Sequence, residues 1–305
     1  MEKTNILHVN KELCGQRLDN FLIKKLKGLP KSLIYKLVRS GQVRVNKKRT
    51  KVSYRITDKD LIRIPPYLIH NEIIAKKIIS NVSDFIHFEN EDFMIIDKPY
   101  GIAVHGGTNQ GVDFLSSLKK SKENKNLSLV HRLDKNTSGC MIISKNYQTA
   151  SFLGKELMNR SVQKKYYALL LGTLSKDIIE IESRIDKDNK NYKMIIDNSE
   201  GREAHTKITL IKQFKTHCLV DVEIETGRTH QIRLHSSSIG HPIAGDNKYN
   251  DESKQSNLNL GLKRLFLHSY HLSFFYNKKY EFIIDLPSDL KEVISKLEEL
   301  NDWKW

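Results

Sequence analysis

Residues 129–145 read LVHRLDKNTSGCMIISK, and this stretch decides how the larger part of the chain folds. Two apolar runs flank a polar loop, a pattern that predicts a strand, a loop and a second strand. Asp134 lies in the loop. A carboxylate on a loop between strands is held in place yet reaches a ligand, so Asp134 is a candidate catalytic residue. Since an Asp in a loop is more often a turn residue, the surrounding residues must decide.

Short runs rich in Ile, Val, Phe and Tyr recur on both sides of this stretch. Each is predicted to be a strand, and the runs are FIHF, FMIID, CMIIS, YYALLLG, CLVDVEIE and FIIDL. Helical patterns lie at 148–159 and 289–300. The Lys- and Asn-rich stretches at 118–126 and 186–193 are expected to be exposed loops. Residues 83–305 are therefore predicted to form an α+β domain with a mixed, mostly antiparallel sheet.

The N-terminal part of the chain has a different pattern. Two short helices are predicted at 18–26 and 32–40, and Gly41 suits the end of the second. A small strand unit follows, with apolar residues at Val43, Val45, Ile56, Leu61, Ile62 and Ile64. The sequence therefore predicts a small α/β domain at 14–66 and a linker at 67–82 before the larger domain.

Basic charge is concentrated in this small domain. The whole chain carries a formal charge of +15, and residues 17–51 contain twelve Lys or Arg against one acid, Asp19, a net charge of +11. A genome-wide compositional bias would spread its lysines along the chain. The concentration predicts a polyanionic partner, because clustered Lys and Arg release condensed counterions from phosphates.

Cysteine usage and hydropathy exclude other classes of protein. Cys14, Cys140 and Cys218 are far apart and form no C-x-x-C pair, so neither a zinc site nor a disulfide framework is predicted. The opening residues, MEKTNILHVNKELC, lack the apolar stretch of a secretory signal, and no later run approaches the length of a membrane span. A cytoplasmic protein without a membrane partner is expected.

The basic segment RLDNFLIKKLKGLPKSLIYKLVRSGQVRVNKKRTK, residues 17–51, resembles the small RNA-binding domain first described in the fourth protein of the small ribosomal subunit. In that module the second helix and the following turn present basic side chains to phosphates. The resemblance implies RNA contacts at Lys31, Ser32, Tyr35, Lys36, Arg39, Lys47, Lys48 and Arg49. For an individual lysine, a solvated surface position is an equally good explanation. Lys59 stands where the family usually has Gly, so the conformation of that turn is left open.

The string HRLD followed by TSG in residues 129–145 resembles the active-site motif of the pseudouridine synthases that modify large-subunit and transfer RNA. In that family the Asp is essential. Three further strings match the family in the same order: IDKPYGIAVH (96–105), QKKYYALLLG (163–172) and ETGRTHQIRLH (225–235). The resemblance therefore extends over nearly the whole chain and implies that Asp134 is catalytic.

The resemblance also implies roles for other residues. The family's Tyr against the target base corresponds to Tyr166 rather than Tyr167. The Arg that pairs with the catalytic Asp corresponds to Arg233 rather than Arg228. The flipped nucleotide leaves a gap, which Arg132 is expected to fill. Substrate-binding residues are expected at Arg132, His131, Thr137, Arg228 and Gln231.

The implied reaction breaks the N1–C1′ glycosidic bond of uridine, rotates the uracil and rejoins it through C5. Because no group is added, no cofactor and no metal are implied. An ionised Asp134 acts at C1′ as nucleophile or at the neighbouring ribose carbon as base, and the sequence leaves both open. A cation such as Arg233 would favour the ionised form. A stacked base must be extruded, and Tyr166 can stack on it and assist proton removal from C5.

The basic N-terminal domain favours 23S ribosomal RNA, or a large-subunit assembly intermediate, as the partner bound in a cleft across the sheet. No oligomer is indicated, so a monomer is expected. A transfer-RNA pseudouridine synthase differs from this prediction in substrate alone. A non-catalytic ribosome-assembly factor is a further alternative, and the intact Asp134, Tyr166 and Arg233 argue against it.

A metal site is the remaining alternative. His131, His230, His235 and Asp134 are residue types that bind metals. It is disfavoured because the segment at 225–235 is expected to be a strand, in which His230 and His235 would face opposite sides.

Overall fold

The computed structural model describes residues 5–26, 31–65, 81–105, 113–188, 193–250 and 260–302. By their internal contacts the residues form two units, Met1–Ser83 with Ala103–Glu123 and Asp84–Ile102 with Asn124–Trp305. Most of the linker expected at 67–82 lies outside the described residues. Within the described part of the chain, no helix has the length and apolar character needed to cross a membrane.

The first unit contains a small sheet packed against two helices. Apart from α4, which is described below, its elements are β1 (Asn5–His8), the 3-10 helix η1 (Lys11–Leu13), α1 (Leu18–Lys25), α2 (Lys31–Arg39), β2 (Arg44–Val45) and β3 (Leu61–Ile64). The three strands are antiparallel in the order β1-β3-β2. One apolar face of each element enters a common core that includes Leu18, Phe21, Ile34 and Ile62. Both predicted helices are confirmed, and β1 precedes the expected start of the domain at residue 14.

Two turns of this unit use the left-handed backbone conformation. Gly41 has a φ of 74°, and its N–H donates to the Val38 carbonyl (3.1 Å) while the Gln42 N–H donates to the Leu37 carbonyl (3.0 Å). This is the Schellman arrangement, so the prediction that Gly41 ends the second helix is confirmed. Lys59, in the turn before Asp60, has a φ of 66°. The lysine thus adopts the left-handed conformation that Gly adopts most readily.

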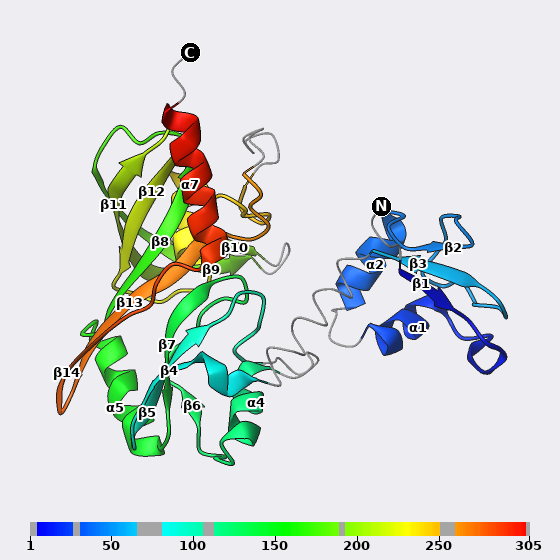
Figure 1. Ribbon diagram of the computed structural model, residues 1–305, viewed down its shortest axis with the longest axis horizontal. Coiled ribbons are helices and arrows are strands. Elements are labelled where there is room, and N and C mark those ends of the chain that lie inside the picture. The colour runs from blue at the N-terminus through cyan, green and yellow to red at the C-terminus, as the bar shows by residue number, and fades with distance from the viewer. Residues whose placement is uncertain are drawn as a thin grey trace. The chain divides into compact units, whose positions relative to one another are not determined.

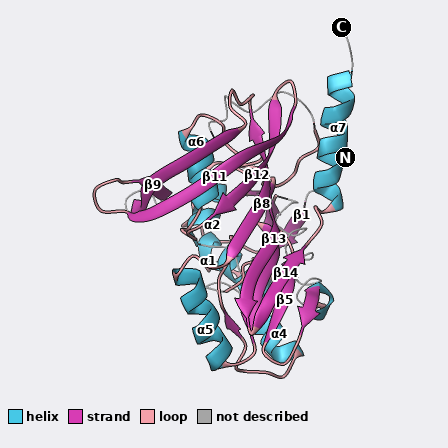
Figure 2. Ribbon diagram, turned by 90° about the vertical axis from the view of Figure 1, so that its left-hand side faces the viewer, coloured by secondary structure: helices cyan, strands magenta, loops and turns pink. Residues whose placement is uncertain are grey.

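The second unit is built on a sheet of 11 strands. They are β4 (Ile86–Glu89), β5 (Phe93–Lys98), β6 (Ser128–Leu129), β7 (Ser138–Ser144), β8 (Gln163–Leu171), β9 (Ile178–Asp188), β10 (Lys193–Ile196), β11 (Arg202–Gln213), β12 (His217–Ile224), β13 (Leu267–Tyr276) and β14 (Lys278–Ile283). The order is β10-β9-β11-β12-β8-β13-β7-β5-β4, with β14 on β13 and β6 on β7 (Figures 1 and 2). Among the described strands only β13 and β7 pair in parallel, so the predicted mixed, mostly antiparallel sheet is confirmed.

The helices of the second unit are α5 (Tyr147–Met158), α6 (Gln231–Ser238) and α7 (Ser288–Asp302). The positions of α5 and α7 agree with the two helical patterns in the sequence. The side-chain amide oxygen of Asn146 accepts the Thr149 N–H at 2.8 Å and so caps the start of α5. Leu153 lies in a core beneath α5 that also contains Phe93 and Ile142.

Two stretches expected to be loops are partly regular. α4 (Phe114–Ser121), which belongs to the first unit, covers the start of 118–126. Asp113 caps α4 by accepting the Ser116 N–H at 2.8 Å. Leu118 is buried on the apolar side of α4, and the cap and this burial stabilise the helix although it carries lysines. In the second stretch, β9 continues to Asp188 and pairs there with Lys193 of β10. The charged side chains face outward while the backbone forms the ladder, and residues 189–192 lie outside the described part.

A close contact joins β7 to β13, where the loop that carries Asp134 ends. Gly139 has a φ of 109°, and a Cβ atom at this position would collide with the Ser269 carbonyl group. Beside it, Ser138 Oγ lies 2.9 Å from His268 Nδ1, and Arg264 Nη2 donates to the same oxygen at 3.0 Å. Only glycine allows the two strands to approach this closely.

The replacement Gly139→Ala is therefore expected to lower the free energy of unfolding by at least about 2 kcal/mol, through steric overlap and an unfavourable φ. Urea unfolding monitored by circular dichroism measures it. The matched control is Gly154→Ala within α5, where an added Cβ meets no atom within 4 Å. This control is expected to raise stability by about 0.5–1 kcal/mol. Equal stability of the two variants would contradict the role of the contact.

Candidate active site

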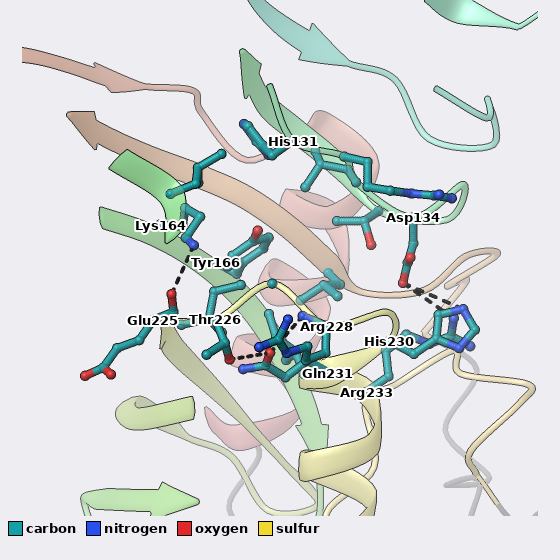
Figure 3. A pocket seen from close by; sticks show the side chains of 18 of the residues that line it. His131, Asp134, Lys164, Tyr166, Glu225, Thr226, Arg228, His230, Gln231 and Arg233 are labelled. Atoms are coloured by element: carbon teal, nitrogen blue, oxygen red, sulfur yellow. Dashed lines mark hydrogen bonds and ion pairs between the residues drawn. The ribbon is translucent and has the colours of Figure 1, made fainter. Parts of the chain in front are cut away.

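A cavity of about 460 Å³ lies in the second unit, beside the loop between β6 and β7. Its walls come from this loop, the end of α5, β8 and the segment that leads from β12 into α6. The structure brings together every catalytic and substrate-binding residue expected from the sequence. These residues are Arg132 and Thr137 together with six that Figure 3 labels: His131, Asp134, Tyr166, Arg228, Gln231 and Arg233. The motifs that carry them are far apart in the chain, and only the fold joins them.

The Asp134 loop is held by backbone hydrogen bonds. The Thr137 N–H donates to the Asp134 carbonyl at 3.1 Å, which closes a tight turn, and the Gly101 N–H donates to the Lys135 carbonyl at 2.9 Å. The Asp134 side chain is 22% exposed and points into the cavity (Figure 3). The carboxylate is thus accessible to a ligand while its backbone is fixed.

A buried lysine supports the same loop. Lys98 Nζ donates to the carbonyl groups of Pro99 (2.9 Å), Ile102 (3.1 Å) and Lys135 (3.4 Å). Burial lowers the pKa of Lys98 to about 7, and the negative charge of Asp134 opposes this shift. Lys98 therefore connects the segment after β5 to the loop that carries Asp134, a function that the sequence analysis does not assign to it.

Arg233 holds a buried ion pair at the bottom of the site. Its Nε and Nη2 atoms donate to the two carboxylate oxygens of Asp246 at 2.7 and 2.8 Å, and Nη1 lies 3.9 Å from Asp134 Oδ2. The Asp246 carboxylate is fully buried, and its Oδ1 also accepts the N–H groups of Lys248 (2.8 Å) and Tyr249 (3.2 Å). Asp246 therefore fixes the guanidinium, which presents its remaining edge to Asp134.

The protonation of this pair follows from its contacts. Burial alone would raise the pKa of Asp246, but the hydrogen bonds and positive charge of Arg233 outweigh it and lower this pKa. Burial likewise opposes the charged form of Arg233, and Asp246 restores it, so the pKa of Arg233 is raised. The pair stays ionised. Sequence reasoning misses Asp246 because an Asp after a Gly reads as an ordinary turn residue.

Tyr166 and Tyr167 face opposite sides of β8. Tyr166 lines the cavity and is 5% exposed, and burial raises the pKa of its hydroxyl group. Tyr167 instead stacks on Tyr270, with ring centroids 3.8 Å apart and an interplanar angle of 6°. β8 lies between β12 and β13, so pairing on both edges limits the movement of Tyr166. Consecutive residues of a strand point to opposite faces of the sheet, so Tyr166 lies in the cavity and Tyr167 does not.

Gln231 organises the loop before α6. Its amide oxygen accepts from the Thr226 hydroxyl (2.7 Å) and the Arg228 N–H (3.0 Å), and its amide nitrogen donates to the His205 carbonyl (2.9 Å) and Thr206 Oγ1 (2.9 Å). All four of its hydrogen-bonding positions are thus used within the protein. Arg228 Nε donates to the Glu203 carbonyl at 2.9 Å, which holds that side chain at the rim.

The remaining lining residues differ in what they offer to a ligand. His131 Nε2 accepts the Ile142 N–H at 3.1 Å, and burial lowers the pKa of this ring to about 3, so it is neutral. Thr137 is buried and Arg132 is exposed. Lys164, which the sequence analysis does not single out, donates to the Glu225 carbonyl at 3.4 Å, and burial lowers its pKa to about 8.

The expectation that 225–235 is a strand is wrong. His230 is the N-cap of α6 and has left-handed φ and ψ angles of 58° and 21°. One face of α6 is buried, with the spacing of a helix, at Gln231, Ile232, His235 and Ser236. The alternation of apolar and polar residues around Ile232 is too short to distinguish a helix from a strand. His235 lies away from the cavity, between Ser183 Oγ (2.8 Å) and Thr206 Oγ1 (2.9 Å). Within the described residues, no group of three or more His, Cys, Asp or Glu could hold a metal.

In the first unit most of the candidate RNA contacts are exposed and basic. The exposed ones are Lys31, Lys36, Arg39, Lys47, Lys48 and Arg49. Tyr35 is half-buried, and its hydroxyl donates to Asp19 Oδ2 at 3.2 Å; the Ser32 side chain lies outside the described part. Asp19, the one acid of the segment, is buried and paired with Arg17 at 2.8 Å. Arg17 thus neutralises the charge of Asp19 locally, and the exposed candidate contacts are left with a positive charge.

Comparison with known families agrees with these observations. A family model described as RNA pseudouridylate synthase matches residues 92–238, and an S4 domain model matches residues 16–62. The solved structure of Human RNA Pseudouridylate Synthase Domain Containing 4 has a TM-score of 0.61 and 24% identity, over 75% of this chain and 97% of that one. Human RNA Pseudouridylate Synthase Domain Containing 1 has a TM-score of 0.57 and 23% identity, over 70% and 94%. At this identity the structures show a shared fold.

Curated relatives match nearly the full chain. Ribosomal large subunit pseudouridine synthase C of Haemophilus influenzae is 37% identical over 306 residues, which cover 96% of this chain and 95% of that protein. The protein of the same name from Vibrio cholerae is 33% identical over 309 residues, with 97% and 98% covered. These lengths include both the small basic unit and the unit with the cavity.

The replacement Asp246→Asn tests the buried ion pair. It leaves the Arg233 guanidinium buried without its charged partner, which is expected to lower the free energy of unfolding by about 3–5 kcal/mol. Urea unfolding measures the change. The matched control is Glu298→Gln, which removes a carboxylate that is 43% exposed and 2.6 Å from Lys212 Nζ, on a lysine that is itself 47% exposed. The control is expected to cost at most about 1 kcal/mol. If the free energy of unfolding falls equally in both variants, the Arg233–Asp246 pair contributes no more to stability than an exposed ion pair.

Proposed function

Because the chain belongs to the RNA pseudouridylate synthase family, we propose that it isomerises specific uridines of 23S ribosomal RNA to pseudouridine. The observation that supports this substrate is the match to ribosomal large subunit synthases over nearly the full length of both chains. The site supports the chemistry, since a partly exposed carboxylate, a buried tyrosine and a paired arginine line one cavity. Like other pseudouridine synthases, the enzyme is an isomerase.

The reaction needs only groups that the cavity contains. The N1–C1′ bond breaks, the uracil rotates, C5 bonds to C1′, and the proton of C5 is exchanged for one at N1. We assign the central role to Asp134, which acts at C1′ as nucleophile or at the adjacent ribose carbon as base. A cavity of about 460 Å³ is large enough for an extruded nucleoside. Tyr166 would stack on its uracil ring, and Arg132 would fill the vacated position in the RNA.

We propose that the small basic unit anchors the RNA. Its exposed lysines and arginines on α2 and after β2 would contact phosphates, which position an RNA without specifying its sequence. The domain boundaries that we propose are 14–66 for the anchor, extended toward the N-terminus to include β1, which pairs with β3, and 83–305 for the catalytic domain. We further propose that the enzyme acts as a monomer in the cytoplasm, where ribosomal RNA is made, on free RNA or on an assembly intermediate.

Mapping of pseudouridine by carbodiimide-dependent reverse-transcription stops tests this function. Cells that lack the gene are complemented with the wild type, with Asp134→Asn or with the control Asp289→Asn. The deletion and the Asp134→Asn strain are expected to lose the same large-subunit sites, because an amide neither attacks C1′ nor accepts a proton there. Asp289 lies outside the cavity, so its variant is expected to restore every site.

Other outcomes of the mapping are equally clear. Loss of transfer-RNA sites alone would retain the chemistry and reject the ribosomal substrate. If every site survives both in the deletion strain and in the Asp134→Asn strain, the enzymatic function is wrong, and a non-catalytic assembly factor becomes the better explanation.

Two adjacent tyrosines give an internal comparison. Tyr166→Phe removes the hydroxyl in the cavity and is expected to lower kcat by about 100-fold or more, as loss of a group that assists proton transfer does. Tyr167→Phe removes a hydroxyl from the opposite face of the same strand and is expected to retain wild-type kcat. Single-turnover assays on a 23S RNA fragment measure both. Equal rates for the two variants would contradict the role of the Tyr166 hydroxyl.

A further inference from the structure

Two nitrogen atoms converge on one oxygen of Asp134. His230 Nε2 lies 3.8 Å from Oδ2, and Arg233 Nη1 lies 3.9 Å from the same atom (Figure 3). Hydrogen bonds to a carboxylate form at about 2.7–3.2 Å, so a shift of about 1 Å would create both. In each of these two ion pairs the closest carboxylate oxygen is Oδ2. The two nitrogens thus approach the same side of the carboxylate.

A chain of hydrogen bonds decides which nitrogen of His230 carries its proton. The Met194 N–H of β10 donates to the Tyr249 hydroxyl oxygen at 3.1 Å, and that hydroxyl lies 2.7 Å from His230 Nδ1. A tyrosine hydroxyl has one proton, and within the described residues Nδ1 is the one acceptor it has. Nδ1 then accepts, and the ring proton is on Nε2, the atom that faces Asp134.

The surroundings of His230 keep the ring neutral and oriented. Burial lowers its pKa to about 4, against the opposing effect of Asp134, so at neutral pH it carries one proton. The left-handed backbone at His230 turns the ring toward Asp134, and Tyr249 packs edge-on against it, with ring centroids 5.4 Å apart. Tyr249 is itself held by its N–H to Asp246 Oδ1 (3.2 Å) and by its carbonyl, which accepts from Ser237 Oγ (2.7 Å).

We propose that His230 is a positioning residue which, with its proton held on Nε2 by Tyr249 and Met194, donates to Asp134 Oδ2 when RNA is bound and leaves Oδ1 to react with the ribose. This inference rests on the proposed function for its chemical consequence. Arg233 binds the same oxygen from the other side, so the pair of donors orients the carboxylate. The sequence spacing of His230, Asp134 and Tyr249 does not indicate this arrangement.

The tautomer is measured first, on the full chain and without substrate. Long-range ¹H–¹⁵N spectra of histidine-labelled protein report which ring nitrogen carries the proton, and the signal absent from His230→Asn identifies His230 among the 12 histidines. Asn tolerates the left-handed conformation, so this variant is expected to fold. A proton on Nε2 is expected in the wild type. A proton on Nδ1 would overturn the inference.

Kinetics test the consequence. At saturating RNA, His230→Asn is expected to lower kcat by about 10- to 100-fold with little change in KM, since it removes one hydrogen bond to a charged group. Tyr249→Phe, which keeps the ring and removes only the hydroxyl, is expected to lower kcat by a smaller factor.

The matched control Tyr276→Phe removes a hydroxyl 3.1 Å from Thr149 and is expected to retain wild-type kcat. Wild-type kcat in His230→Asn would overturn the inference. An inactive wild-type chain would instead overturn the proposed function, on which the NMR result does not depend.

Discussion

The active site depends on the buried ion pair between Arg233 and Asp246. Each charge alone would be too costly to bury, and together they form two short hydrogen bonds, at 2.7 and 2.8 Å, that fix the guanidinium plane. Asp246 also accepts the N–H groups of Lys248 and Tyr249, so it orders the turn after Gly245. Asp246 thus holds both Arg233, whose Nη1 lies 3.9 Å from Asp134 Oδ2, and the backbone of Tyr249. The surroundings of the Asp134 carboxylate thus depend on a second carboxylate, that of Asp246.

The sheet supplies the complementary constraint. Asp134 lies on a loop that ends at β7, and β7 meets β13 in the one parallel pairing among the described strands. The contact of Gly139 with the Ser269 backbone brings the Asp134 loop close to β8, the neighbour of β13 that carries Tyr166. Because β8 is paired on both edges, Tyr166 cannot move to the opposite face of the sheet without breaking a ladder. The cavity is therefore preorganised by backbone pairing on one side and by an ion pair on the other.

Much of this arrangement can be predicted from the sequence, and the exceptions have physical reasons. Tyr166 and Tyr167 are distinguished by motif spacing, and the period of a strand then places them on opposite faces. The segment at 231–238 misleads because a short alternation of apolar and polar residues fits a strand as well as a helix. β9 and β11 are missed because their many charged residues conceal the strand pattern. Asp246 is missed because its function arises only from a contact with Arg233, 13 residues earlier, that local patterns do not encode.

The central claim is that this chain, by itself, exchanges the C5 proton of uridine during isomerisation. The most direct measurement uses purified protein and a 23S RNA transcript labelled with tritium at C5 of uridine. Tritium is expected to be released to water in the absence of any cofactor or added metal, and release is expected to stop at a small whole number of equivalents per RNA. Enzymatic isomerisation would be contradicted if no tritium were released from the ribosomal transcript, from tritium-labelled large-subunit assembly intermediates or from a transfer-RNA transcript, with protein in excess over RNA.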